Sequence, residues 1–223
     1  MNKIDQMYAE TTDCSEFGQQ YAQYLNTLLR ALDFECIARL IQAFCEAREA
    51  GSRIFFIGNG GSAATASHFA TDLAIGARLS EKPFKAISLT DNASAVSAVS
   101  NDDGYEFVFE KQLEVYLEPG DLLVAISASG NSQNLLGAVE YAKRRGNKTI
   151  GIIGFDGGDL RKLCDETIHI ETGAGEYGPV EDMHLILNHL IVSYLHRWAR
   201  DPERESGADK GIEDLLLTQP VEL

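Results

Sequence analysis

Apolar side chains recur at helical spacing through the first part of the chain. Within residues 16–50 they stand three or four positions apart, and Asp33 interrupts the run. This periodicity predicts two amphipathic helices, with Asp33 as the cap of the second one. Because their apolar content exceeds what one face of a sheet could cover, we expect both helices to pack between subunits of an oligomer.

From residue 53 the pattern changes to short, continuous apolar runs with helical segments between them. Continuous apolar strands that alternate with helices predict a parallel sheet covered on both faces. The expected fold class is therefore α/β, with a five-stranded parallel sheet flanked by helices. The strands are expected at 54–57, 86–89, 122–126, 150–153 and 167–170, and the helices at 62–76, 93–99, 105–116, 132–145 and 179–200.

These patterns divide the chain into three parts. Residues 1–50 are expected to form an N-terminal helical segment, and residues 51–200 an α/β domain. Residues 201–223 are polar and rich in acidic side chains, which is typical of a solvated tail.

The charge balance excludes some classes of partner. The 223 residues include 19 basic and 34 acidic side chains, which gives a net charge of −15. A field of this sign repels nucleic acid, whereas a small anionic substrate can still be held by a local ring of backbone N–H groups. The chain has no C-x-x-C pair, no secretory signal and no run of the roughly 18 apolar residues that a membrane span needs. We expect a cytoplasmic protein with no membrane or nucleic-acid partner.

Two strand ends carry unusual chemistry. Gly-Asn-Gly-Gly-Ser at 58–62 follows the first strand, and Ser-Ala-Ser-Gly-Asn-Ser at 127–132 follows the third. Ligands of parallel sheets bind beyond the carboxyl ends of the strands, and hydroxyls with backbone N–H groups suit a phosphate ester. In the first loop, Ser62 is expected to cap a helix whose N-terminus favours an anion. A single loop of this kind could be a plain strand-to-helix turn with no binding role. Two such loops at neighbouring strand ends favour a binding site.

A dinucleotide site is the weaker interpretation of the first loop. Residues 58–63 fit the relaxed G-x-G-x-x-A fingerprint, and Asp91 ends the second strand where a ribose-binding acid could lie. This hypothesis leaves the serine-rich loop at 127–132 unexplained.

Histidines and carboxylates form a third candidate site. His68 and Asp72 are four residues apart and share one face of a helix, and the last helix carries Glu181 and His189. Such groups bind metals or transfer protons. Glu181 and His189 stand about 12 Å apart along a helix, which favours a site shared between subunits. A lone histidine on an apolar helix or strand is more often a structural residue. We therefore expect structural roles for His169, His184 and His196.

With both loops in view, the chain resembles the sugar-isomerase (SIS) domain proteins, and within them the bacterial phosphoheptose isomerases. The similarity extends over about residues 15–198. Besides the two loops, it rests on Ser-Asn-Asp-Asp-Gly-Tyr at 100–105, Gly-Phe-Asp-Gly-Gly at 154–158 and the Glu-Asp-Met-His segment from 181. The resemblance implies a flavodoxin-like SIS fold for residues 51–200, and a homotetramer whose sites lie at subunit interfaces.

The family also implies roles for individual residues. Zn²⁺ would be bound by His68, Asp72, Glu181 and His189. Ser127, Ser129 and Ser132 would hold the sugar phosphate. The whole substrate-binding set carried over is Asn59, Gly60, Gly61, Ser62, Asn101, Asp102, Ser127, Ala128, Ser129, Ser132 and Glu181.

Two of the four metal positions depart from the family pattern. The family usually has Glu where this chain has Asp72, and Gln where it has Glu181. The first change shortens the side chain by one methylene, and the second adds a negative charge beside the metal. Zinc accepts Asp, Glu and His alike, so the carboxylate gained is expected to offset the length lost.

The activity implied by the resemblance is an aldose–ketose isomerase. It would convert D-sedoheptulose 7-phosphate to D-glycero-D-manno-heptose 7-phosphate in bacterial heptose biosynthesis. Asp72 or Glu181 would be the base that takes the carbon-bound proton, His189 would be the acid, and Zn²⁺ would polarise the carbonyl.

Two other functions remain as alternatives. One is a non-catalytic SIS-domain protein that binds a sugar phosphate or associates with a replication initiator. His189 argues against it, because such relatives tend to lose this histidine. The other is a sugar-phosphate-sensing transcription regulator, which would need a basic DNA-binding domain that the acidic residues 1–50 do not supply.

Overall fold

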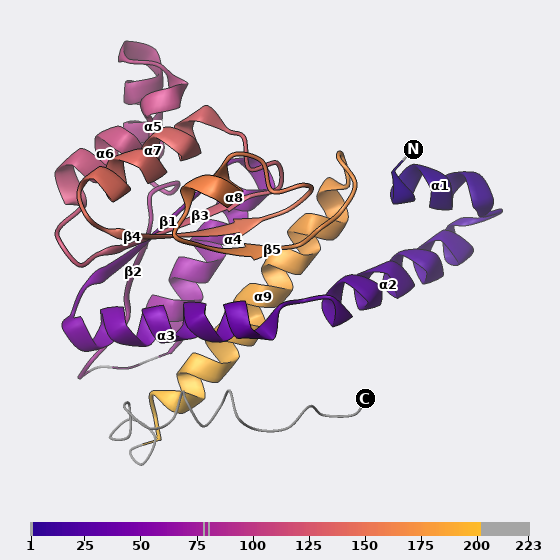
Figure 1. Ribbon diagram of the computed structural model, residues 1–223, viewed down its shortest axis with the longest axis horizontal. Helices are drawn as coiled ribbons and strands as arrows, with labels where there is room; N and C mark the ends of the chain where they lie inside the picture. Colours follow the sequence, from indigo (N-terminus) through magenta and orange to yellow (C-terminus); the bar gives the residue numbers. More distant parts are fainter. Residues whose placement is uncertain (1, 78, 80, 202–223) are drawn as a thin grey trace.

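The computed structural model describes residues 2–77, 79 and 81–201 (Figure 1). Nearly all of the expected acidic tail, residues 202–223, lies outside the described residues. The strands are β1 Arg53–Gly58, β2 Lys85–Ser88, β3 Leu122–Ser127, β4 Lys148–Ile153 and β5 Glu166–His169. The α-helices are α1 Lys3–Glu10, α2 Cys14–Arg30, α3 Phe34–Ala50, α4 Gly60–Thr71, α5 Ala93–Asp102, α6 Glu110–Tyr116, α7 Gln133–Arg144, α8 Leu160–Leu163 and α9 Tyr177–Trp198.

The five strands form one parallel sheet in the order β2-β1-β3-β4-β5. This confirms the expected fold class. Because the chain moves outward from β1 in one direction to β2 and in the other to β3, the carboxyl ends of β1 and β3 lie on either side of a topological switch point. Open α/β sheets bind their ligands at such a point.

Helices cover both faces of the sheet, as the continuous apolar strands predict. One core joins β1, through Phe56, to α3, α4 and α9, and in it the rings of Phe44, Phe56 and Phe69 pack together. The other core joins Phe55 and its strand neighbours to α6, α7 and α8. Helices α4 and α9 therefore lie together on the same side of the sheet, which brings two distant parts of the sequence into one layer.

The two N-terminal helices α1 and α2 contact the start of α9. The carboxylate of Glu176, which is 1% exposed, accepts hydrogen bonds from the Lys3 backbone N–H at 2.6 Å and from the Tyr24 hydroxyl at 2.5 Å. Tyr21 donates to Asp182 at 2.6 Å. Figure 1 shows α2 leading into the start of α3 and projecting away from the sheet. The use of the two helices predicted within residues 16–50, which are α2 and α3, in an oligomer stays a prediction.

Several elements differ from the expectations in detail. The single helix expected at 105–116 is wrong, because the 3₁₀ turn Tyr105–Phe107 precedes a separate α6. The helix expected at 62–76 begins at Gly60, and its last turn is the π-helix Asp72–Gly76. Helices α1 and α8 were not expected, since both are short. Asp33 caps α3 as predicted, accepting from the N–H groups of Glu35 and Cys36 at 3.0 Å.

No helix within the described ranges is long and apolar enough to cross a membrane.

Candidate functional site

The loops that follow β1 and β3 are joined to each other by a pair of side-chain amides. Asn59 Nδ2 donates to Asn134 Oδ1 at 2.9 Å, and Asn134 Nδ2 donates back to Asn59 Oδ1 at 2.9 Å. Asn59 stands at the start of α4 and Asn134, which is buried, in the first turn of α7. The two helix N-termini at the switch point are therefore fixed relative to each other, as a shared binding site requires.

The serine-rich loop after β3 is folded tightly on itself. Ser127 Oγ accepts a hydrogen bond from the Gly130 N–H at 3.0 Å. Gly130 has φ +68°, and a Cβ at this position would overlap the carbonyl oxygen of Gly157, so glycine is required. Ala128 is buried, whereas Ser129 and Ser132 are half-buried. This loop places hydroxyls and backbone N–H groups at one end of the sheet, where they can hold an anion without a basic side chain.

A pocket of about 600 Å³ opens between the two loops. Tyr105 on its rim donates a hydrogen bond to Asn59 Oδ1 at 2.7 Å. The volume is in the range of pockets that hold small organic ligands. Its lining consists of Asn59, Tyr105, Glu106, Ser132, Gln133 and Asn134.

The first turn of α4 differs from expectation in its cap. Asn59, not Ser62, is the N-cap residue, and Ser62 is buried at 4% exposure. The Asn59 side chain makes no capping bond because its amide is committed to Asn134 and Tyr105. The N–H groups at the start of α4, which begins with Gly60 and Gly61, are therefore left for an anionic ligand.

Two further predicted substrate contacts lie at the exposed end of α5. Asn101 Nδ2 donates to Asp102 Oδ1 at 2.7 Å, so the two side chains pair with each other. The same segment continues into Tyr105, which does reach the loop after β1.

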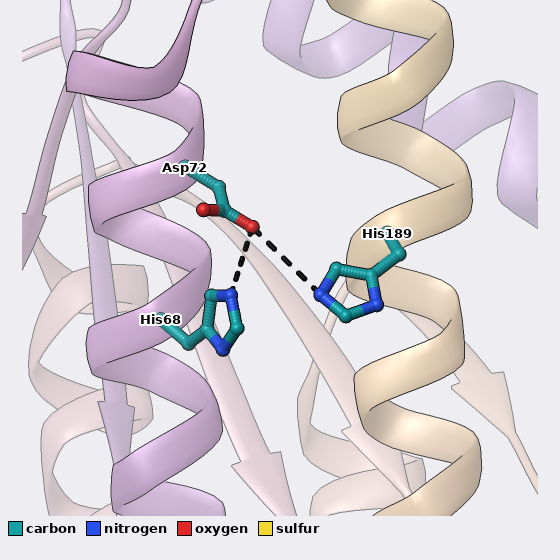
Figure 2. A group of neighbouring side chains, drawn as sticks. All are labelled: His68, Asp72 and His189. Atoms are coloured by element: carbon teal, nitrogen blue, oxygen red, sulfur yellow. Dashed lines mark ion pairs between the residues drawn. The ribbon is translucent and has the colours of Figure 1, made fainter.

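Three of the four predicted metal ligands come together between α4 and α9. His68 Nε2 lies 3.1 Å from Asp72 Oδ2, and His189 Nε2 lies 4.0 Å from the same oxygen (Figure 2). The two imidazole rings are 5.1 Å apart, and one donor atom from each of the three residues lies within 4.8 Å of the others. Figure 2 shows His68, in the last turn of α4, and Asp72, one turn later at the start of the π-helical turn, both facing His189 on α9.

The fourth predicted ligand, Glu181, lies outside this group. It stands two turns before His189 on α9, and a Cβ placed on Gly61 would overlap its carboxylate. Glu181 thus faces the first turn of α4, while His68 and Asp72 occupy the last turns of the same helix. The three-residue cluster and the Glu181 carboxylate are the two ends of the α4–α9 contact.

Two residues that the sequence did not place in the candidate site also contact Asp72. Asn188 Nδ2 donates to Asp72 Oδ2 at 3.3 Å, and His196 Nε2 donates to the Asp72 backbone carbonyl at 2.9 Å. The structural interpretation of His196 therefore misses this contact. An amide inside an otherwise apolar helix face was the available signal for Asn188.

The other two histidines serve structural roles, as expected. His184 is 1% exposed, and burial lowers its pKa to about 3, so it is neutral in the folded protein. His169 lies 2.9 Å from the Phe155 carbonyl through Nε2.

Known proteins resemble this chain in both sequence and structure. The sequence pattern of the SIS domain family matches residues 17–154. A phosphoheptose isomerase from Nitratiruptor sp. is 40% identical over 150 residues, which are 67% of this chain and 79% of that protein. The structures of phosphoheptose isomerases from Neisseria gonorrhoeae and Francisella tularensis are 29% and 26% identical, with TM-scores of 0.69 and 0.74. They cover 81% and 88% of this chain, and 95% and 100% of their own. The chain therefore belongs to the phosphoheptose isomerases, a family of sugar-phosphate isomerase enzymes built on the SIS domain.

Proposed function

We propose that this protein interconverts D-sedoheptulose 7-phosphate and D-glycero-D-manno-heptose 7-phosphate, in the cytoplasm and as a step of bacterial heptose biosynthesis. The observation that carries the proposal is the cluster of His68, Asp72 and His189. Helix α4 contributes to this cluster near its C-terminal end, and its N-terminal end lies beside the pocket at the switch point. Proton-transfer groups and an anion-binding end are both needed for isomerisation of a phosphorylated sugar.

The serine-rich loop is the proposed phosphate site. Ser129 and Ser132 are half-buried, whereas Ser127 is buried and its Oγ accepts from the Gly130 N–H. Neutral donors of this kind hold the phosphate in place, and the sugar then extends toward Asn59 and the start of α4. Fixed orientation of this sort contributes several kcal/mol, on the order of a hundredfold or more in rate.

The proton transfers are assigned to a carboxylate and an imidazole. The base takes a proton from C1 of the ketose, and the acid returns one to C2, while the O1 hydroxyl loses its proton and O2 gains one. Asp72 is the first candidate for the base and His189 is the proposed acid. Asp72 Oδ2 and His189 Nε2 face each other within the cluster, 4.0 Å apart, and would bind the metal. The other carboxylate oxygen, Oδ1, and the other ring nitrogen, Nδ1, are therefore the atoms left for the proton transfers. Glu181, over the first turn of α4, is the second candidate for the base.

The three-residue cluster fits a zinc ion in its donor chemistry. Two imidazole nitrogens and one carboxylate oxygen are the ligands that catalytic zinc sites use, with a further position left for substrate. Zn²⁺ held by His68, Asp72 and His189 would polarise the sugar carbonyl and stabilise the negative charge that develops on oxygen. Glu181 is proposed as a fourth ligand, which requires its side chain to leave the first turn of α4.

We also propose that the working unit is a homotetramer with sites at the subunit interfaces. His68 and His189 have side chains 45% and 54% exposed, so the cluster is open on one side of the single chain. A second subunit would close it. Retention of His189 within the cluster favours an enzyme over a non-catalytic binding protein.

The direct test measures turnover and metal content together. The purified protein is incubated with sedoheptulose 7-phosphate, with and without added Zn²⁺, and the aldose is quantified. His68→Ala should lose both bound metal and activity, whereas the matched change His169→Ala, on β5, should keep both. The proposal fails if the intact assembly makes no aldose heptose phosphate, and conversion of a six-carbon ketose phosphate alone would instead reassign the substrate.

A further inference from the structure

Asn188 places an amide where the surrounding helix face is apolar. The residue is 0% exposed and lies on the buried side of α9, beside Leu187 and Ile191. Its Nδ2 donates to Asp72 Oδ2 at 3.3 Å, and its Oδ1 has no hydrogen-bond partner in the described part of the chain. An unpaired buried oxygen lowers the free energy of unfolding. The Nδ2 group of Asn188, which does have a partner, is therefore the part of the amide that calls for a functional explanation.

The atom that accepts from Asn188 is also the one that both histidines of the cluster approach. Asp72 Oδ2 is the oxygen that lies 3.1 Å from His68 and 4.0 Å from His189. Asn188 approaches it from the interior of the α4–α9 contact, whereas the two imidazoles are solvent-exposed. The amide is thus the buried donor to a carboxylate whose other neighbours sit at the surface.

The helical hydrogen-bonding pattern also changes at Asp72. Asp72 begins the π-helical turn Asp72–Gly76, and His196 holds its carbonyl oxygen at 2.9 Å. A π-turn inside a helix is frequent at functional sites because it redirects side chains. Aspartate is also one methylene shorter than the glutamate usual in this family. Helix α9 thus holds Asp72 twice, its backbone carbonyl through His196 and its carboxylate through Asn188.

We propose that Asn188 is a positioning residue that holds the Asp72 carboxylate in the orientation needed to bind a divalent metal with His68 and His189. The inference deepens the proposed function and rests on it. Outer partners of metal-binding groups fix the ligand's orientation, and their loss reduces metal affinity by about 10- to 100-fold.

The test uses the full-length, metal-stripped protein and Asn188→Leu, which keeps the branched shape and the number of heavy atoms and removes both polar atoms. Zn²⁺ binding is measured by calorimetry, and Co²⁺ binding by its visible absorption. We expect affinity to fall about 10- to 100-fold, while the thermal midpoint of the metal-free protein stays the same or rises, since the unpaired Oδ1 is gone. Ile191→Val, on the same buried face, should lower the midpoint and leave the affinity unchanged.

A double-mutant cycle addresses the shorter side chain directly. Asn188→Leu is made in the natural chain and in Asp72→Glu. Because glutamate reaches further, the loss of affinity caused by Asn188→Leu should be smaller in the Asp72→Glu background. Equal losses in both backgrounds, or metal binding by Asn188→Leu as tight as that of the natural chain, would overturn the proposal.

A readout in the metal-free protein separates this inference from the proposed function. Nitrogen NMR of the imidazoles reports which ring nitrogen carries the proton, and Asp72 Oδ2 should hold His68 with its proton on Nε2. Asn188→Leu should give a mixture of tautomers. If the natural chain binds neither metal, the metal assignment fails, and unchanged His68 spectra in Asn188→Leu would then exclude the positioning role as well.

Discussion

The hydroxyl of Tyr105 donates to Asn59 Oδ1 at 2.7 Å, and Asn134 Nδ2 donates to that same oxygen at 2.9 Å. Both acceptor positions of the Asn59 amide oxygen are therefore filled from within the protein. One N–H of Asn59 is used by Asn134, which leaves the other to point at a ligand in the pocket. Tyr105 thus fixes the orientation of a residue proposed to contact the sugar.

Removal of this hydroxyl should weaken substrate binding more than it slows the chemical step. In Tyr105→Phe the Asn59 amide loses one of its two acceptor bonds, which is worth about 1 kcal/mol, or roughly fivefold in affinity. We expect KM for the sugar phosphate to rise about fivefold with a smaller change in kcat. Steady-state kinetics checks this, with Tyr116→Phe at the end of α6 as the matched control. A lowered kcat at constant KM would contradict the positioning role.

The position of Glu181 makes Gly61 a sensitive site. A Cβ at Gly61 would overlap the Glu181 carboxylate, although alanine itself suits a helix better than glycine. If Glu181 is the base in its present position, Gly61→Ala should therefore displace the carboxylate and lower kcat/KM by about tenfold or more, with little loss of folding stability. A Glu181 that acts only as the fourth metal ligand, away from this turn, would leave kcat/KM nearly unchanged. The same change in a Glu181→Ala background should cost much less, because nothing remains to be displaced. Additive losses in the two backgrounds would show that Gly61 acts on the ligand directly.

The fold was predictable from the sequence because of how its strands are buried. Strands β1, β3 and β4 are buried on both faces and appear in the sequence as unbroken apolar runs, such as the one that holds Phe55 and Phe56 in β1. The edge strands β2 and β5 are partly exposed, and their short apolar runs between helical segments also predicted them. The π-turn at Asp72–Gly76 could not be predicted, because it is a change in hydrogen bonding that leaves the residue pattern intact. Helix α1 is held mainly by contacts with distant residues such as Glu176, which local periodicity does not record.

The parts of the candidate site that depend on the spacing of residues along the sequence were predictable. His68 and Asp72 are one helical turn apart, and the loops at 58–62 and 127–132 end neighbouring strands, so their placement follows from the sheet. The direction of the Glu181 side chain depends on packing between α4 and α9, which no local pattern encodes. The Asn59–Asn134 pair is likewise a tertiary contact between residues 75 positions apart.

The docking of the N-terminal helices should depend on one buried hydroxyl. Tyr24 donates at 2.5 Å to Glu176, a carboxylate 1% exposed, and burial together with this contact raises the pKa of Tyr24. In Tyr24→Phe the buried carboxylate loses a donor, so the free energy of unfolding should fall by about 1.5–3 kcal/mol. Tyr21→Phe removes a bond to the exposed Asp182 and should cost less than about 1 kcal/mol. Urea titration of the two variants measures the difference, and equal losses would contradict the role of burial.

The last prediction concerns acid stability, and it follows from His184. Burial lowers the pKa of this histidine from 6.5 to about 3, so between these values the unfolded chain binds a proton that the folded chain does not. Stability present above pH 6.5 is therefore lost as the pH falls toward 3, by about 2 kcal/mol between pH 8 and pH 5. His184→Leu removes this dependence, while all carboxylates are unchanged. The variant should thus gain on the natural protein by about 2 kcal/mol between pH 8 and pH 5 in denaturant titrations. Parallel loss in the two proteins would mean that His184 becomes protonated without unfolding.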